Sequence, residues 1–187
     1  SKKYEHLPID TKYFKELEFE ILSQFEDLDQ AIDGWLIKSD NYQALNTLLP
    51  KFKGKVQTIY IDPPFNTGSD FEYIDRYQDS SWLTLMENRL NLSKKYLTRT
   101  GGLFLHLDWN SNYLGRILLE EVFGKENFVN EVIWRIGWVS GYKTQVNGFV
   151  RNHDTLYVFA NSKKEFFFKK NDSKIPYFSF KHSLIKE

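Results

Sequence analysis

The 187 residues suffice for one domain with a substantial core, and 25 Lys and Arg balance 25 Asp and Glu, so no global basic field indicates a polyanion partner. The absence of cysteine excludes disulfide frameworks, thiolate metal sites and cysteine nucleophiles, and it fits a cytoplasmic protein. No stretch approaches the roughly 20 apolar residues of a membrane span, so we expect no membrane partner.

The first part of the chain predicts two helices and two strands. Apolar residues recur at helical spacing from Thr11 to about Ile32, which indicates an amphipathic N-terminal helix. Gly34 interrupts this pattern, and a short strand is predicted from Trp35 to Asp40. A helix from Asn41 to Pro50 should end at its proline. A basic turn then leads into a strand from Val56 to Ile61.

After a loop, the alternation of helix and strand continues. A helix should begin at Ser80 or Ser81 and run to about Leu97, and Gly101-Gly102 should end it before a strand from Leu103 to Asp108. The stretch SNYLGRILLEEVFG predicts another helix, and FVNEVIWRIGW and HDTLYVFAN predict two more strands. This order is typical of an α/β fold with a doubly wound sheet, most of it parallel.

Three parts are expected along the chain. Residues 1–33 form an N-terminal helical segment, residues 34–170 form the main domain, and residues 171–187 are the less regular start of a further region.

Three predicted strands end in an acid: Asp40, Asp62 and Asp108. Ligands of open α/β sheets bind beyond the carboxyl ends of the strands, so these acids should lie along one rim. For a single acid, a helix N-cap or a solvated turn is the more ordinary interpretation. Asp62 differs because Pro63 and Pro64 follow it and restrict the backbone on both sides.

The sequence Asp-Pro-Pro-Phe (62–65) therefore presents a carboxylate, a carbonyl outside the sheet ladder and an aromatic face as one stiff set. Such a set can hold a flat heteroaromatic amine, with hydrogen bonds in its plane and stacking on one side. No metal is needed for this, and no metal site is predicted.

With the blocks around it, this tetrapeptide resembles the signature of the DNA amino-methyltransferases. The stretches IKSDNYQALNTLLPKFKGKVQTIYIDPPFNTG, SSWLTLMENRL, GGLFLHLD, FGKENFVNEVIW and NHDTLYVFAN are similar to the beta class of adenine-N6 enzymes, and more narrowly to modification subunits of type III restriction-modification systems. The resemblance covers roughly residues 33 to 165. It implies part of a Rossmann-like, circularly permuted methyltransferase fold, with S-adenosylmethionine as the methyl donor.

The resemblance also implies roles for single residues. Asp62 and the carbonyl of Pro63 would bind the adenine amino group, Pro64 belongs to the same catalytic motif, and Phe65 would stack on the flipped base, where Tyr is more usual. Asp40 and Asn41, together with Asp62, would contact the cofactor; Ser39 stands before Asp40 where Gly is more usual.

Further residues are implied near the target base. Asp108 matches a block that shapes the target pocket, and Asn66, His153 and Asp154 match positions near the base or the DNA. A His-Asp pair at a strand end is by itself more often structural. The loop from Asn66 to Asp79 carries Phe71, Tyr73, Arg76 and Tyr77, which either face DNA or pack internally.

Three alternatives to this interpretation differ from it in features that the sequence shows. A nicotinamide or phosphate-binding Rossmann enzyme would need G-x-G-x-x-G or G-x-x-x-x-G-K-[ST], and the sequence has neither. A non-catalytic DNA-binding or assembly module would not need the intact tetrapeptide. Cytosine N4 is the second target amine, although Ser is then more usual than Asp at the first motif position.

The glycine-containing cofactor loop Phe-x-Gly-x-Gly of the family does not occur in this sequence. We therefore expect the chain to be the N-terminal, target-base part of a larger protein, inactive alone and weak in binding S-adenosylmethionine. Double-stranded DNA is the implied partner, and a homodimer and a restriction subunit are further candidate partners.

Overall fold

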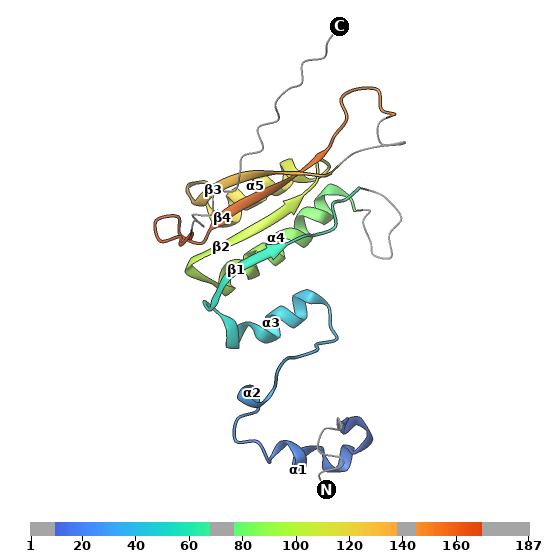
Figure 1. The fold of residues 1–187 in the computed structure, drawn as a ribbon, viewed down its shortest axis with the longest axis vertical. Helices are drawn as coiled ribbons and strands as arrows, with labels where there is room; N and C mark the ends of the chain where they lie inside the picture. The colour runs from blue at the N-terminus through green and yellow to red at the C-terminus, as the bar shows by residue number, and fades with distance from the viewer. Residues whose placement is uncertain (1–9, 68–76, 138–144, 170–187) are drawn as a thin grey trace. The chain divides into compact units, whose positions relative to one another are not determined.

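The computed structural model describes residues 10–67, 77–137 and 145–169. The chain divides into two compact units, Ser1–Asp40 and Asn41–Glu187, and Figure 1 shows the elements of each. The expected boundary lies between residues 33 and 34, and the division between the two units lies seven residues later, after Asp40. The expected further region at 171–187 lies outside the described residues, as do Phe71, Tyr73 and Arg76.

The N-terminal unit is helical, but in short pieces instead of one long helix. It contains two 3₁₀ turns, η2 (Thr11–Tyr13) and η3 (Lys15–Leu17), and two helices, α1 (Glu18–Leu22) and α2 (Leu28–Ala31). The interruption has a local cause at Asp27, whose backbone is extended and whose side chain accepts hydrogen bonds from the N–H groups of Asp29 and Gln30. Asp27 therefore starts a new helix as an N-cap.

The strand expected from Trp35 to Asp40 is wrong, because this segment has no regular secondary structure. Leu36 is 100% exposed, and Trp35 and Ile37 are also exposed, at 44% and 43%. A short apolar run becomes a strand only where a neighbouring strand can pair with it. No described strand pairs with this one.

The second unit alternates helices and strands. Its elements are α3 (Asn41–Phe52), β1 (Val56–Ile61), α4 (Asp79–Tyr96), β2 (Leu97–Leu107), α5 (Asn112–Phe123), η4 (Lys125–Asn127), β3 (Phe128–Arg135) and β4 (His153–Ala160). The α/β class is therefore confirmed. Helix α3 continues two residues past Pro50, which lies in its last turn.

The four strands form a sheet in the order β1-β2-β4-β3. Strands β1 and β2 are parallel, whereas β2 pairs with β4, and β4 with β3, in antiparallel orientation. The expectation of a mostly parallel sheet is therefore wrong for the described strands. The reason is that β3 runs along the outer edge and the chain returns as β4 into the position beside β2.

Gly101 and Gly102 were expected to end the long helix, but they lie inside β2. Strand β2 begins directly after α4, and its register with β1 shifts between Val56↔Leu97 and Thr58↔Gly102. A Cβ atom on Gly101 would lie 2.7 Å from the carbonyl oxygen of Gln57. The glycine therefore permits a close backbone approach at this irregularity.

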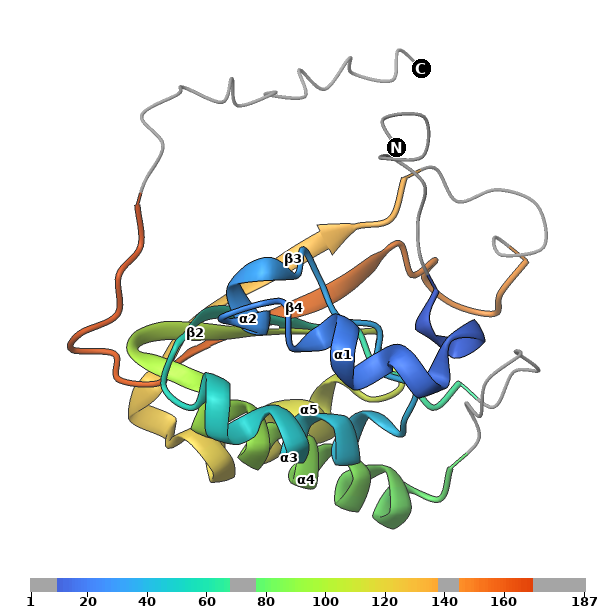
Figure 2. The ribbon, with the colours of Figure 1, turned by 90° about the horizontal axis from the view of Figure 1, so that it is seen from below.

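The core lies between the sheet and helices α4 and α5, which cover the same face of it (Figure 2). Leu103, Leu105 and Leu107 of β2 are fully buried, as expected for every second residue of a strand. The fully or almost fully buried residues that meet them are Trp82, Met86 and Leu90 of α4, Leu119 and Phe123 of α5, and Phe159 of β4. The alternate residues of β2, among them His106, face the other side of the sheet.

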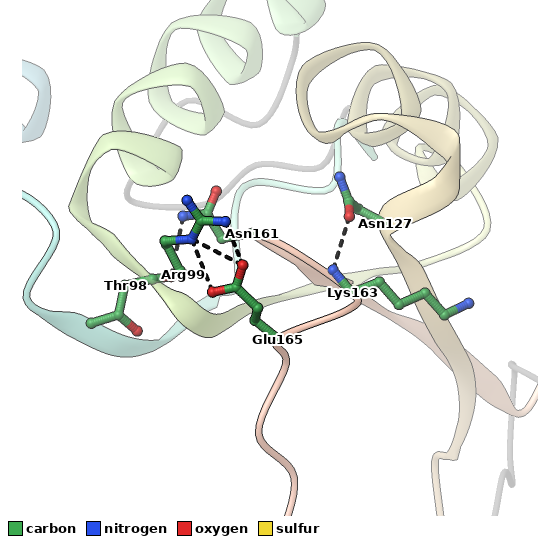
Figure 3. A network of polar contacts seen from close by, with 6 residues as sticks. All are labelled: Thr98, Arg99, Asn127, Asn161, Lys163 and Glu165. Carbon is green, nitrogen blue, oxygen red and sulfur yellow. Dashed lines mark hydrogen bonds and ion pairs between the residues drawn. The ribbon is translucent and has the colours of Figure 1, made fainter.

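Polar contacts hold the segment after β4 at the start of β2 (Figure 3). Arg99 makes a bidentate ion pair with Glu165, and the Asn161 side chain donates to the carbonyls of Leu97 and Thr98 at 3.2 and 3.1 Å. The backbone N–H of Lys163 donates to Asn127 at 2.9 Å. This end of the sheet is thus closed by structural contacts, and the opposite end carries the polar residues described below.

None of the helices in the described ranges is long and apolar enough to span a membrane.

Two residues of α5 test the position of the core. Leu119 is fully buried against the sheet, whereas Ile117 is 65% exposed on the same helix. We expect Leu119→Ala to lower the free energy of unfolding by about 2–5 kcal/mol, since the truncation leaves a cavity. Ile117→Ala should change it by about 0.5 kcal/mol or less. Urea unfolding of both variants measures this, and equal effects would contradict the assigned core.

Candidate active site

Three acids lie together at the end of the sheet opposite the polar contacts drawn in Figure 3. Asp62 follows β1, Asp108 follows β2, and Asp154 is the second residue of β4. The pairs Ile61↔Leu105 and Leu107↔Thr155 place these three positions on neighbouring strands at one rim. The rim predicted for Asp62 and Asp108 is therefore present, and Asp154 joins it because β4 runs antiparallel to β2.

Asp40 does not follow a strand, so the expectation of an acid delivered to this rim by a strand is wrong for Asp40. It is the last residue of the N-terminal unit. Asn41 is the first residue of α3, and its side-chain oxygen accepts a hydrogen bond from Nε of Arg89 in α4 at 3.1 Å. Their cofactor roles stay a prediction.

The turn after β1 is held by the core. Trp82 of α4 is fully buried, and its indole N–H donates to the carbonyl of Pro64 at 2.8 Å. Pro63, Pro64 and Phe65 are half-buried, whereas Asp62 is exposed. The helix therefore holds the middle of the turn and leaves the carboxylate at its start in solvent.

Asn66 closes this turn. Its φ of 60° lies in the left-handed region, which Asn tolerates better than most residues. Its side-chain oxygen accepts from the N–H of Tyr77 at 2.7 Å, and its amide donates to Asp79 at 3.3 Å. Asn66 thus joins the turn to the start of α4, and a role of Asn66 in DNA contact stays a prediction.

A histidine that the sequence analysis did not single out lies at the centre of the rim. Tyr60 Oη and His106 Nδ1 are 2.7 Å apart, and His106 Nε2 lies 3.1 Å from a carboxylate oxygen of Asp154. The ring of His106 also contacts that of Phe65, with 5.7 Å between centroids and planes at 52°. His106 therefore connects the turn to β4.

The side chains of His153 and Asp154, which were both predicted near the target base or the DNA, lie on opposite faces of the sheet. Successive residues of a strand point to opposite faces, so Asp154 shares a face with His106 and His153 does not. His153 is exposed. One signal in the sequence marks His106: it is a polar residue between the buried Leu105 and Leu107, two residues before Asp108. Its partner Asp154 depends on strand order, which the pattern does not contain.

The acids of the rim influence the titration of their neighbours. Burial raises the pKa of Asp108, the negative charge of Asp154 adds to this, and hydrogen bonds from Asn110 and Ser111 oppose it. Burial also raises the pKa of Tyr60, as do the charges of Asp62 and Asp154. The Tyr60 hydroxyl therefore keeps its proton in the neutral range and acts as a donor.

Next to the rim lies a cavity of about 380 Å³ lined by Trp109, Val146, Asn147, Gly148, Phe149 and Arg151. The guanidinium of Arg151 lies 3.6 Å from the ring centroid of Trp109, a cation–π distance. Trp109 follows Asp108 directly in the chain, so one wall of this cavity begins where β2 reaches the rim. In the described ranges no group of three His, Asp or Glu residues can hold a metal ion.

The arrangement combines an exposed carboxylate, a rigid turn rich in carbonyl acceptors and an aromatic ring held at a defined position. These groups can recognise a flat amine through in-plane hydrogen bonds and stacking. The carboxylate of Asp62 and the carbonyl oxygens of the turn accept hydrogen bonds and do not attract anions. The rim is therefore suited to a ligand with a neutral or cationic donor group.

Comparisons with known proteins agree with this chemistry. Residues 56–186 match the family model described as DNA methylase. The probable type III restriction-modification enzyme HindVI Mod subunit of Haemophilus influenzae is 39% identical over 135 residues, covering 66% of this chain and 18% of that protein. The type II methyltransferase M.EcaI of Enterobacter cloacae is 31% identical over 165 residues, covering 83% of this chain and 34% of that protein.

Among solved structures, an M1.HpyAVI–SAM complex is similar with a TM-score of 0.49 and 14% sequence identity, over 74% of this chain and 60% of that one. Of the two curated relatives named before it, the chain spans well under half the length, 18% and 34%. The resemblance to amino-methyltransferases and to type III modification subunits, which rested on the tetrapeptide and its surrounding blocks, is confirmed.

Asp108 should make stability depend on pH. Because its pKa is raised above the ordinary value of an aspartate, 3.8, the folded protein binds this proton more tightly than the unfolded chain. The contribution of Asp108 to stability therefore falls as the pH rises from about 4 towards 7. We expect the melting temperature of Asp108→Asn, relative to the parent, to shift upward over this range. A difference between the two melting temperatures that does not change with pH would contradict the raised pKa of Asp108.

Proposed function

Since this chain belongs to the DNA methylase family, whose model matches residues 56–186, we propose that it forms the target-base side of a DNA methyltransferase. The enzyme would transfer the methyl group of S-adenosylmethionine to N6 of adenine in duplex DNA, as the modification component of a restriction-modification system. The observation that carries this proposal is the Asp62–Phe65 turn, which the Trp82–Pro64 hydrogen bond holds in place.

The chemistry requires an amine in a defined position. The N6 lone pair of adenine is delocalised into the ring, so adenine N6 is a poor nucleophile. The carboxylate of Asp62 and the carbonyl of Pro63 would accept hydrogen bonds from the two N–H groups of the adenine amine. They would thereby favour a nitrogen geometry in which the lone pair points towards the methyl group. Positioning of the amine and stabilisation of the developing positive charge together lower the activation barrier by roughly several kcal/mol.

The base must first leave the duplex, which costs on the order of a few kcal/mol. Stacking on Phe65 would offset about 1–3 kcal/mol of this cost. Phe65 is half-buried and packs against the core, so part of its side chain remains accessible for a base. Duplex DNA is then the partner, and Asp108 and Asp154 would border the pocket of the flipped base.

The residue types present fit S-adenosylmethionine, which brings a methyl group on a positively charged sulfur, a methionine ammonium and ribose hydroxyls. Asp62 offers an exposed carboxylate next to the amine site. Asp40 and Asn41 would complete this chain's contacts to the cofactor. The glycine loop of the family is absent from this sequence.

The Mod subunit of Haemophilus influenzae and the M.EcaI methyltransferase are both longer than this chain. By analogy with the first, a type III system is the proposed setting, with a restriction subunit and a second copy as protein partners. The DNA of a bacterial cell lies in the cytoplasm, which is therefore the proposed location. Cytosine N4 is the second candidate amine, because the family model covers DNA methylases in general.

Nucleoside analysis tests the proposal. DNA from cells that express the complete protein, digested and analysed by mass spectrometry, should contain N6-methyladenine. Asp62→Ala should abolish this product without unfolding the protein, because Asp62 is exposed. Phe65→Tyr should keep most of the activity, since the ring that stacks is unchanged, and serves as the matched control.

N4-methylcytosine in place of N6-methyladenine would overturn the adenine assignment. Methylation by Asp62→Ala at the parental rate would remove the proposed catalytic role of the turn.

A further inference from the structure

A hydrogen-bonded chain crosses three strands at the rim. Tyr60 of β1, His106 of β2 and Asp154 of β4 lie on the same face of the sheet, away from α4 and α5. The two contacts of the histidine are 2.7 Å to Tyr60 and 3.1 Å to Asp154. The side chains of His106 and Asp154 are only 16% and 14% exposed, so little water competes for the contact between these two.

In the neutral form of His106, its two partners determine which ring nitrogen carries the proton. An ionised carboxylate only accepts hydrogen bonds, so Nε2 is the N–H that donates to Asp154. Nδ1 is then an acceptor, and it receives the hydroxyl hydrogen of Tyr60, whose raised pKa keeps it protonated. Both ring nitrogens are thus used, and rotation of the ring would break two hydrogen bonds at once.

The fixed ring contacts two aromatic neighbours. Tyr60 meets it edge-on, with centroids 6.2 Å apart and planes at 66°. Phe65 meets it at 5.7 Å and 52°. The backbone next to Phe65 is held separately, by Trp82 at Pro64 and by the contacts of Asn66. The backbone of the turn therefore has its own supports, and the ring of Phe65 has two contacts of its own: the hydrophobic core, against which it packs, and the ring of His106.

We propose that His106 is a positioning residue for the Phe65 ring, with Tyr60 and Asp154 holding His106 in one orientation. This inference rests on the proposed function, in which Phe65 stacks on the flipped base. His106 itself does not touch the reacting atoms. Its effect on methylation passes through the orientation of Phe65, so it should disappear when the ring of Phe65 is removed.

A double-mutant cycle in the complete protein tests this. The variants are His106→Ala, Phe65→Ala and the combination of both, with kcat and KM for duplex DNA measured by methyl transfer at saturating cofactor. We expect His106→Ala to lower kcat/KM by about 10- to 100-fold, the range for a slightly misplaced catalytic geometry. In the Phe65→Ala background the same substitution should change kcat/KM by less than about twofold, because coupled residues are not additive.

Two milder variants keep the test usable if His106→Ala fails to fold. Tyr60→Phe removes one hydroxyl from a residue that is 57% exposed, and Asp154→Asn keeps the size of the side chain. Both should lower kcat/KM. The loss in Tyr60→Phe should again vanish in the Phe65→Ala background, whereas Asp154→Asn should retain the part of its loss that comes from bordering the base pocket. Ile117→Ala, an exposed change on α5, should leave kcat/KM at the parental value and serves as the control.

Equal losses in both backgrounds would overturn the inference, since His106 would then act without Phe65. Parental kcat/KM in His106→Ala would overturn it as well. These outcomes presuppose an active parent, so they are distinct from a failure of the proposed function, in which the parent itself yields no methylated base.

Discussion

The hydrogen bond between the Trp82 indole and the Pro64 carbonyl is the contact on which the site depends. Trp82 is fully buried, so its N–H must find an acceptor inside the protein. Strand β1 has ended at that point, and the prolines contribute carbonyls without contributing N–H groups. The indole takes the carbonyl of Pro64. The same contact satisfies a core residue and fixes the backbone that presents Asp62 and Phe65.

Around this contact, the turn is supported from two independent directions. Asn66 joins its end to the start of α4 through Tyr77 and Asp79. His106 supports its aromatic ring from the opposite face of the sheet, with help from Tyr60 and Asp154. Rigidity of this kind fits a site whose main task is to position a weak nucleophile, because positional errors of about 1 Å are costly for catalysis.

Sequence reasoning predicted the elements that depend on local signals. The prolines after Asp62 predicted the stiff turn, and apolar periodicity predicted β1, α4 and α5. It failed where pairing between distant segments decides the structure. The segment before Asp40 has no regular secondary structure, and the antiparallel insertion of β4 put Asp154 beside His106. A strand order cannot be read from alternation within each strand.

The central claim is that the Asp62–Phe65 turn holds the target amine, and a structure of the complete protein with duplex substrate DNA and a non-reactive analogue of S-adenosylmethionine tests it most directly. The account predicts a flipped adenine stacked on Phe65, with N6 about 2.7–3.2 Å from both the Asp62 carboxylate and the Pro63 carbonyl oxygen. A flipped base bound elsewhere, with this turn left empty, would contradict it.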